Sequence, residues 1–287
     1  MKPKLFYLAM LFISIFFQNV TYAKGFFYVL ETDSSKVYLF GSIHIAKSSA
    51  YPLDQIVDSV FNECKNVVFE INLKNLDPFQ ILAYGTIKDN STLEQVIPKK
   101  YYNIVDSLFK KYSIPKFFYN KMQPWFAILF LINLDFIYSA PDFVEGVDLY
   151  FLKKIDSTKR VFELESLIEQ INIFKSLYEL SPEFFLEYFL IQTRQDTTSF
   201  NRTYNAWLKG DETPLLIELN TDFANEVEKE FNSILNEQRN LKMVSKIMDY
   251  LSSYETYFVI VGAAHLLGES GIVSLLKRNG YKVRRLL

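Results

Sequence analysis

The sequence predicts an α/β (α+β) fold, with a mixed central sheet flanked by helices and a large helical insertion. Long segments of the chain carry apolar residues at helical spacing. With 49% hydrophobic and 17% aromatic residues, the 287-residue chain can also bury a large core. Between the helical segments, β-branched and aromatic runs predict strands of one sheet at residues 26–30, 36–40, 67–71, 160–164, 257–261 and 281–286.

Residues 1–23 have the pattern of a secretory signal peptide, which is removed from a mature protein. Lys2 and Lys4 give a basic start, residues 5–17 are almost wholly apolar, and the segment ends in small residues at Ala23. This apolar run is shorter than the roughly 20 residues that cross a bilayer as a helix. We therefore expect cleavage after Ala23, no transmembrane span in the mature chain, and an exported protein, either periplasmic or extracellular.

Residues 24–287 are predicted to form a single domain, with the helical insertion at about residues 76–138 and a further helical part at about residues 166–253. The formal net charge is −2, and removal of the signal segment takes away two lysines and no acid. This balance argues against a nucleic-acid partner, because such partners require a basic surface. Cys64 is the only cysteine, so it cannot form an internal disulfide and is predicted to be a core residue.

The two histidines of the chain occupy matching positions. His44 follows Gly41 by three residues at the end of one predicted strand, and His265 follows Gly262 by three residues at the end of another. A glycine there lets the backbone turn sharply, and ligands of open α/β sheets bind at the carboxyl ends of the strands. Neutral imidazole is a common metal ligand. We expect His44 and His265 to meet at one edge of the sheet around one ion; two merely packed turns are the alternative.

Two charged residues accompany the histidines. Glu70 lies in the predicted strand at residues 67–71, where a buried acid is costly unless it binds a metal or is paired. It is therefore a candidate ligand or base, with a buried ion pair to an arginine as the alternative. Arg239 lies in a predicted helical segment at residues 222–251. It either faces solvent or binds a carboxylate or an oxyanion at the same edge.

Short blocks of this sequence resemble the TraB/GumN family, which includes the animal Tiki membrane metalloproteases. Two residues depart from the family pattern: Ser42 stands where threonine is usual, and Ala264 where glycine is common. The blocks extend over nearly the whole chain after the signal segment and occur in family order: GSIH at 41–44, Glu70, QPW at 123–125, EGVD at 145–148, ELE at 163–165 followed by Gln170, residues 204–211 with Trp207, RN at 239–240 and GAAHLLG at 262–268.

The resemblance implies a mixed α/β core with a helical insertion, related to the erythromycin-esterase and ChaN group. It also implies a metal site built from His44, His265 and Glu70. The Tiki branch implies a manganese- or cobalt-dependent peptidase acting on a peptide or protein, and the ligand set is also compatible with zinc. Glu70 and Arg239 are the first expected catalytic residues. If Glu70 is a ligand, the base must be another acid, for which the candidates are Glu145, placed first, Asp148, Glu163 and Glu165.

Three functions stay open at this point. The first, which we favour, is a secreted or periplasmic metal-dependent hydrolase, specifically a peptidase. The second is a non-catalytic binding protein that captures a peptide, haem or iron, and product formation would separate it from the first. The third is a structural or regulatory envelope protein whose Gly-x-x-His turns only pack, which failure to bind any metal would favour. The sequence leaves the oligomeric state open.

Overall fold

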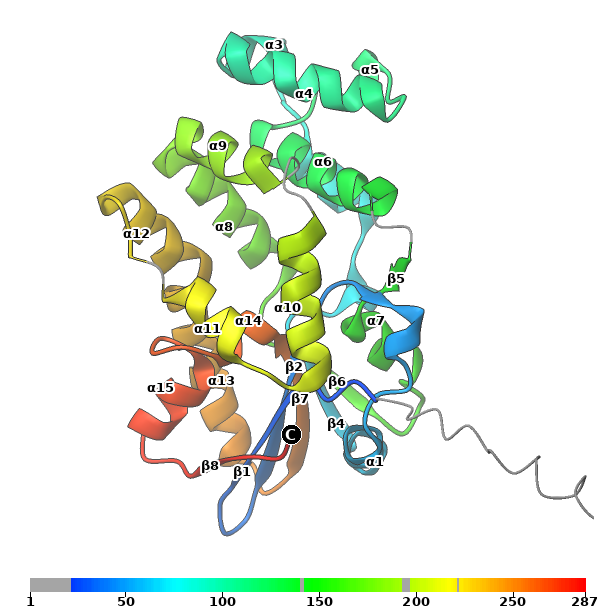
Figure 1. Cartoon of the computed structure of the whole chain (residues 1–287), viewed down its shortest axis with the longest axis vertical. Coiled ribbons are helices and arrows are strands. Elements are labelled where there is room, and N and C mark those ends of the chain that lie inside the picture. The colour runs from blue at the N-terminus through cyan, green and yellow to red at the C-terminus, as the bar shows by residue number, and fades with distance from the viewer. Residues whose placement is uncertain (1–21, 140–141, 193–196, 221) are drawn as a thin grey trace, which may run out of the picture.

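The computed structural model describes residues 22–139, 142–192, 197–220 and 222–287. A mixed six-stranded sheet has the strand order β6-β4-β7-β2-β1-β8 (Figure 1). All six predicted strand segments belong to this sheet, so the predicted α/β class is confirmed. The strands are β1 (Phe26–Glu31), β2 (Lys36–Ser42), β4 (Asn66–Phe69), β6 (Arg160–Glu163), β7 (Thr256–Gly262) and β8 (Val283–Arg285).

The register of the sheet brings distant chain segments to one edge. β2 pairs in parallel with β7, so that Ser42 lies opposite Gly262. β4 is parallel to β7 on its other side and also to β6, whereas β1 is antiparallel to both β2 and β8. The carboxyl ends of β2, β4, β6 and β7 therefore share one edge, and the residues that follow these strands become neighbours.

Aromatic side chains on the two faces of β7 show how helices cover the sheet. Phe258 contacts Phe61 of α1 (Gln55–Glu63) and Phe151 of α7 (Val147–Lys153). The next residue back, Tyr257, stacks on Tyr250 of α13 (Gln238–Leu251). Because successive side chains of a strand point to opposite faces, α13 covers one face and α1 with α7 the other. Such two-sided burial explains the continuous apolar sequence of β7.

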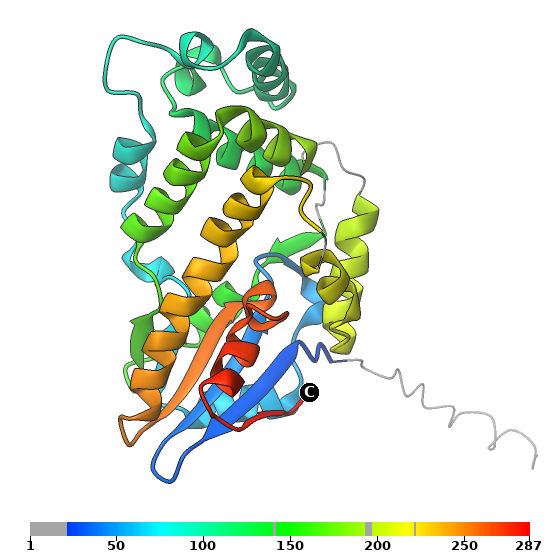
Figure 2. The same cartoon turned by 90° about the vertical axis from the view of Figure 1, so that its left-hand side faces the viewer.

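A helical layer stands over the carboxyl edge of the sheet (Figures 1 and 2). It has its own apolar cluster, in which Phe109, Leu131, Phe185 and Phe231 are buried. The predicted helical insertion is thus observed, and the apolar run at residues 125–134 lies in a packed helix. The layer contains α3 (Leu93–Val96), α4 (Lys99–Lys111), α5 (Lys116–Tyr119), α6 (Pro124–Ser139), α8 (Leu167–Leu180), α9 (Pro182–Gln192) and α12 (Glu226–Asn232).

One long helix joins the sheet to this layer. A π-helical turn (Ser233–Glu237) connects α12 to α13, so this helix runs from the helical layer down along the sheet (Figure 2). On the other face, Trp207 of α10 (Thr197–Lys209) packs on Phe40 and donates a hydrogen bond to the Gly41 carbonyl at 2.8 Å. The helices not yet named are η1 (Ser48–Ala50), η2 (Leu73–Asn75), α2 (Pro78–Gly85), α11 (Thr213–Leu219), α14 (Ala263–Leu266) and α15 (Ile272–Arg278).

One local prediction was wrong in detail. Strand β4 ends at Phe69, so Glu70 is the first residue beyond the strand rather than inside it. After β7 the chain forms two helices, α14 and α15, with Gly268 between them at a left-handed φ of +81°. Before α7, β5 (Phe143–Glu145) pairs with β3 (Ala46–Lys47).

Most of the predicted signal segment, residues 1–21, lies outside the described residues, so cleavage after Ala23 stays a prediction. Ala23 itself is buried and forms a parallel bridge with Leu53. Within the described part of the chain, none of the helices has the length and apolar character needed to cross a bilayer.

Candidate metal and catalytic site

A cavity of about 380 Å³ lies between the carboxyl edge of the sheet and the helical layer. His44, Glu70, Arg239 and His265 all line it, although they come from four separate parts of the chain. His44 follows β2, Glu70 follows β4, Arg239 lies at the start of α13, and His265 lies in α14. The parallel register of β2, β4 and β7 is what brings these side chains together.

His265 is held in one protonation state by its surroundings. The imidazole is buried, and its Nδ1 lies 2.6 Å from Oδ1 of Asn240, whose amide nitrogen donates to the Ser270 carbonyl at 2.9 Å. Nδ1 must therefore carry the proton, because an amide oxygen only accepts. Burial lowers the pKa of His265, so the ring is neutral near pH 7. Its unprotonated Nε2 faces Glu70, 4.0 Å from Oε1.

Glu70 is a buried carboxylate surrounded by donors. Its Oε1 accepts hydrogen bonds from Arg239 Nη2 at 2.6 Å and Gln170 Nε2 at 3.1 Å, and its Oε2 accepts from the Gly262 N–H at 3.1 Å. Burial opposes ionisation, but the positive charges of His265 (in its protonated form), Arg239 and His44, together with this backbone N–H, outweigh it and hold the pKa of Glu70 at about 2. Glu70 is therefore ionised at any physiological pH.

Arg239 bridges two buried acids. Besides Glu70, its Nε and Nη2 bind Glu165 in a two-point contact at 2.8 and 2.6 Å. Its Nη1 donates to the carbonyl of Leu235, which lies in the π-helical turn just before α13. Such turns recur at functional sites because they change which way the following side chains face. The alternative of a buried Glu–Arg pair is thus what the structure contains, and it lies within the same cavity as both histidines.

Gln170 completes this network from the first turn of α8. Its Nε2 contacts both Glu70 and Glu165, at 3.1 and 3.2 Å. The helix begins in a capping box, in which the Ser166 hydroxyl accepts from the Glu169 N–H and the Glu169 carboxylate accepts from the Ser166 N–H. This well-defined helix start orients Gln170 toward the two carboxylates.

His44 lies at the open side of the cavity, with a side chain 73% exposed. Its Nδ1 is 3.5 Å from Oδ2 of Asp148, and this pairing raises the pKa of His44 to about 9. Gly146 makes the approach possible, since a Cβ there would lie 2.1 Å from the His44 carbonyl oxygen. Because the ring is so exposed, solvent screens the pairing and weakens it.

Asp148 is the acid best placed for further chemistry in this cavity. Its Oδ1 accepts from the Ser42 hydroxyl at 3.2 Å. Its buried Oδ2 accepts no hydrogen bond from any residue that the structure describes. Apart from its ion pair with His44 Nδ1 at 3.5 Å, this oxygen therefore has an open position for a water or a cation.

The chemistry of these donors suits a divalent cation. The cavity offers a neutral imidazole fixed through its other nitrogen, an ionised carboxylate, the second histidine and Oδ2 of Asp148, which accepts no hydrogen bond from the described residues. A hydrogen bond to the non-ligating nitrogen is the usual way in which proteins orient a metal-binding histidine. Among the residues that the structure describes, however, no group of three or more histidine, cysteine or acidic side chains lies close enough together to hold an ion.

The other predicted acids lie away from the cavity. The carboxylate of Glu145 pairs with Lys153 at 2.7 Å, and Glu163 accepts from the Asn72 N–H at 3.1 Å. Neither is among the residues that line the cavity. The roles of Asn240 and Gln170 were not predicted, because an amide beside an arginine or an acid in sequence carries no signal of which distant group it will contact.

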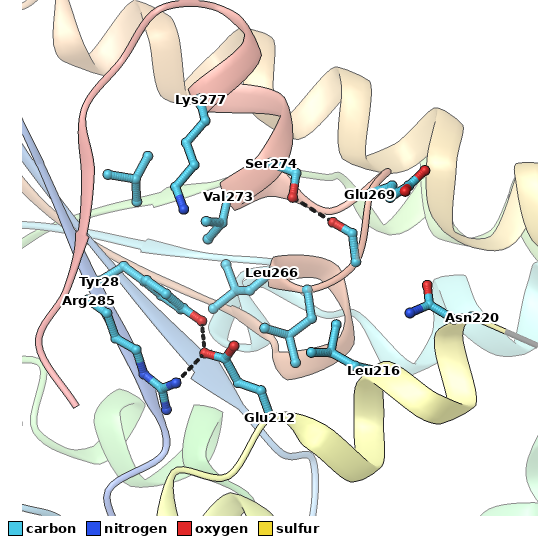
Figure 3. Close-up of a pocket in the computed structure, with 13 residues that line it drawn as sticks. Tyr28, Glu212, Leu216, Asn220, Leu266, Glu269, Val273, Ser274, Lys277 and Arg285 are labelled. Atoms are coloured by element: carbon cyan, nitrogen blue, oxygen red, sulfur yellow. Dashed lines mark hydrogen bonds and ion pairs between the residues drawn. The ribbon is translucent and has the colours of Figure 1, made fainter.

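A second, larger hollow of about 480 Å³ lies on the other side of α14 (Figure 3). Neither histidine lines it. Glu212 accepts hydrogen bonds from Tyr28 and from Arg285 there, so the charges at its floor satisfy one another. We place the candidate site in the smaller cavity, because only that cavity collects both histidines and the ionised Glu70.

Comparisons with known proteins relate the chain to two metalloproteases. The chain is 21% identical to Metalloprotease TIKI1 of Xenopus tropicalis, over 91% of this chain and 61% of that protein. It is 25% identical to the Metalloprotease TIKI homolog of Amphimedon queenslandica, over 88% of this chain and 60% of that protein. The chain thus spans about three-fifths of the length of these curated relatives. None of the solved structures matches it significantly.

A family match extends over nearly the whole chain. The sequence profile of the TraB/PrgY/gumN family matches residues 26–285, which run from the first residue of β1 to the last residue of β8 and include His44, Glu70 and His265. A match of this extent covers the whole sheet and the helical layer above it. The chain therefore belongs to the TraB/PrgY/gumN family.

Proposed function

We propose that this protein is an exported metal-dependent hydrolase, specifically a peptidase, which acts in the cavity lined by His44, Glu70 and His265. One observation carries the proposal: a neutral, amide-anchored His265 directs its unprotonated Nε2 toward an ionised Glu70, 4.0 Å away. The likeness to the Tiki metalloproteases supports the same reading. The predicted signal segment supports export.

Each residue of the cavity has a separate role in the proposed hydrolysis. A divalent ion such as manganese, cobalt or zinc, held by His44, His265 and Glu70, would polarise a scissile carbonyl and lower the pKa of a water. Asn240 keeps the proton of His265 on Nδ1, and Arg239 keeps Glu70 ionised. The guanidinium also adds a fixed positive charge at the cavity floor, which favours the negative charge that develops on a carbonyl oxygen. Asp148 lines the cavity and Glu145 does not, so Asp148 is better placed as the base.

The test combines metal analysis with a cleavage assay. Mature protein prepared without chelators should contain bound metal by elemental analysis and should cleave peptides of a mixed library. His44→Ala and His265→Ala should each remove most of the metal and the cleavage. Glu70→Gln should remove the metal if Glu70 is a ligand, but should abolish only cleavage if Glu70 is the base.

Lys277→Ala is the matched control: Lys277 lines the second hollow but not the candidate site, so the variant should retain both metal and activity. Protein that takes up none of the three metals and releases no product would overturn the proposal.

One observation favours a second function, non-catalytic binding. Both oxygens of Glu70 already accept hydrogen bonds from Arg239, Gln170 and Gly262, so the carboxylate is satisfied without any ion. A peptide-binding protein could use such a fixed charge for recognition alone. Stoichiometric peptide binding without product formation, at saturating metal, would favour this function over hydrolysis.

A further inference from the structure

The lining of the cavity divides into a charged set of residues, here called the floor, and an apolar set, here called the wall. The floor consists of His44, Glu70, Arg239 and His265, and Gln170 and Asp148 flank it. The wall carries no charged side chain, and it combines residues from the segment after β4 with residues of α7 and α8: Ile71, Leu73, Leu149, Ile173 and Phe174. Each of these five side chains keeps part of its surface accessible.

Core packing does not account for this wall. Ile71, Leu73 and Leu149 belong to neither of the two apolar clusters formed by the described residues. Leu149 is 40% exposed, although its neighbours Val147 and Phe151 on α7 are fully buried. Ile173 and Phe174 lie at the border of the helical cluster, where the ring of Phe174 contacts Phe189. The apolar surface is therefore turned toward the cavity.

The wall and the floor are joined at α7. Leu149 directly follows Asp148, whose Oδ2 faces His44 across 3.5 Å. Ile71 directly follows Glu70. A peptide bond held at the floor would therefore have a neighbouring side chain within reach of the wall. An apolar side chain gains from leaving water at such a surface, whereas a polar one loses hydrogen bonds to water and finds no partner.

We infer that this wall selects substrates with a bulky, uncharged apolar side chain, such as leucine, methionine or phenylalanine, next to the scissile bond. The inference rests on the proposed function for its substrate class. Leu149 and Phe174 are the specificity-determining residues, and they act by contact with the substrate side chain. Replacing a substrate side chain that fits an apolar pocket by one that fits it less well typically changes kcat/KM roughly 10-fold to 100-fold.

The cleavage test compares two matched peptides that differ only by leucine against its polar isostere asparagine beside the scissile bond. Wild-type protein should cleave the leucine peptide at least about 10-fold faster in kcat/KM. Leu149→Ala should remove most of this preference. Ile168→Ala is the matched control, because Ile168 is an exposed apolar residue of α8 that does not line the cavity. Equal cleavage of the two peptides would overturn the inference and leave the hydrolase proposal intact.

A binding test separates the two proposals if nothing is cleaved. Fluorescence anisotropy with labelled leucine and asparagine peptides is measured on the folded His265→Ala protein and on His265→Ala/Leu149→Ala. Tighter binding of the leucine peptide, lost on Leu149→Ala, supports the apolar wall even if the wild type shows no hydrolysis. Equal binding of the two peptides, together with no hydrolysis, would overturn both proposals.

Discussion

Nδ1 of His265 lies 2.6 Å from the side-chain oxygen of Asn240, a residue that precedes it by 25 positions and lies on α13. The contact joins a helix on one face of the sheet to the turn after the central strand β7. It determines which nitrogen of the histidine is free, so the chemistry of the cavity depends on a residue that does not itself supply a ligand.

Replacement of Asn240 by alanine should weaken metal binding by about 10-fold to 100-fold, the usual loss when the partner of a metal-binding histidine is removed. The imidazole would lose its orientation and its preferred tautomer. Isothermal titration with manganese, cobalt and zinc measures the change. Asn236→Ala is the matched control, because Asn236 lies one helical turn earlier and bonds only Asn232. An unchanged metal affinity in Asn240→Ala would show that the contact between Asn240 and His265 serves only the packing of α13.

Replacement of Arg239 by methionine should lower the free energy of unfolding by about 3–5 kcal/mol, because it leaves two buried carboxylates without their counter-charge. Glu70 and Glu165 both depend on this guanidinium. Urea unfolding measures the loss. Arg160→Met is the control: Arg160 pairs with Glu255 at the surface, and such exposed pairs contribute about 0–1 kcal/mol. Similar losses of unfolding free energy in both variants would contradict the stabilising role of Arg239 between the two buried carboxylates.

We expect the pKa of one histidine to lie above the ordinary value of 6.5 and the pKa of the other to lie below it. The pKa of His44 is raised to about 9 by Asp148, whereas burial lowers that of His265. The ring protons of the only two histidines can be followed by NMR in the metal-free protein. Asp148→Asn should move the His44 titration toward 6.5 and leave His265 nearly unchanged. A His44 pKa near 6.5 in the wild type would contradict the pairing.

The directions of these pKa shifts also determine how the stability of the fold and the affinity for metal depend on pH. The His44–Asp148 pairing stabilises the fold fully below about pH 6.5 and loses its effect as the pH rises through about 9. The pKa of Glu70 is lowered from its ordinary 4.5 to about 2. Its interactions therefore stabilise the fold fully above about pH 4.5, and this stabilisation is lost as the pH falls toward 2. Metal must displace the His44 proton, so the apparent affinity should rise with pH up to about 9.

The exported protein should begin at Lys24, because the pattern of residues 1–23 predicts a cleaved signal peptide. Expression of the full sequence in a host with a secretory pathway, followed by N-terminal sequencing and mass measurement, checks this. Substitution of Ala23 by a bulky residue should impair cleavage, whereas Lys24→Gln should not. Exported protein that still starts at Met1 would contradict the prediction.

The strands and their common sheet can be predicted from sequence patterns alone. The run Tyr257 to Val261 can be recognised locally, since a strand buried on both faces must be continuously apolar. The two Gly-x-x-His turns are equally local signals, from which we expected His44 and His265 to meet at one sheet edge around one ion. Both side chains line one cavity, and the shared ion stays a prediction. Glu70 was expected inside its strand, where an acid requires a partner; it lies just after β4 and pairs with Arg239.

The contacts of these residues depend on the three-dimensional fold and cannot be read from local sequence patterns. The parallel register of β4 against β7 places Glu70 beside Gly262 and His265, and the π-helical turn at Ser233–Glu237 directs Arg239 and Asn240 to them. Likewise, the pairing of His44 with Asp148 depends on the close approach of the β5–α7 turn at Gly146. Hydrogen bonds between residues 25 to 192 positions apart depend on register and helix phase, and local propensity in the sequence specifies neither.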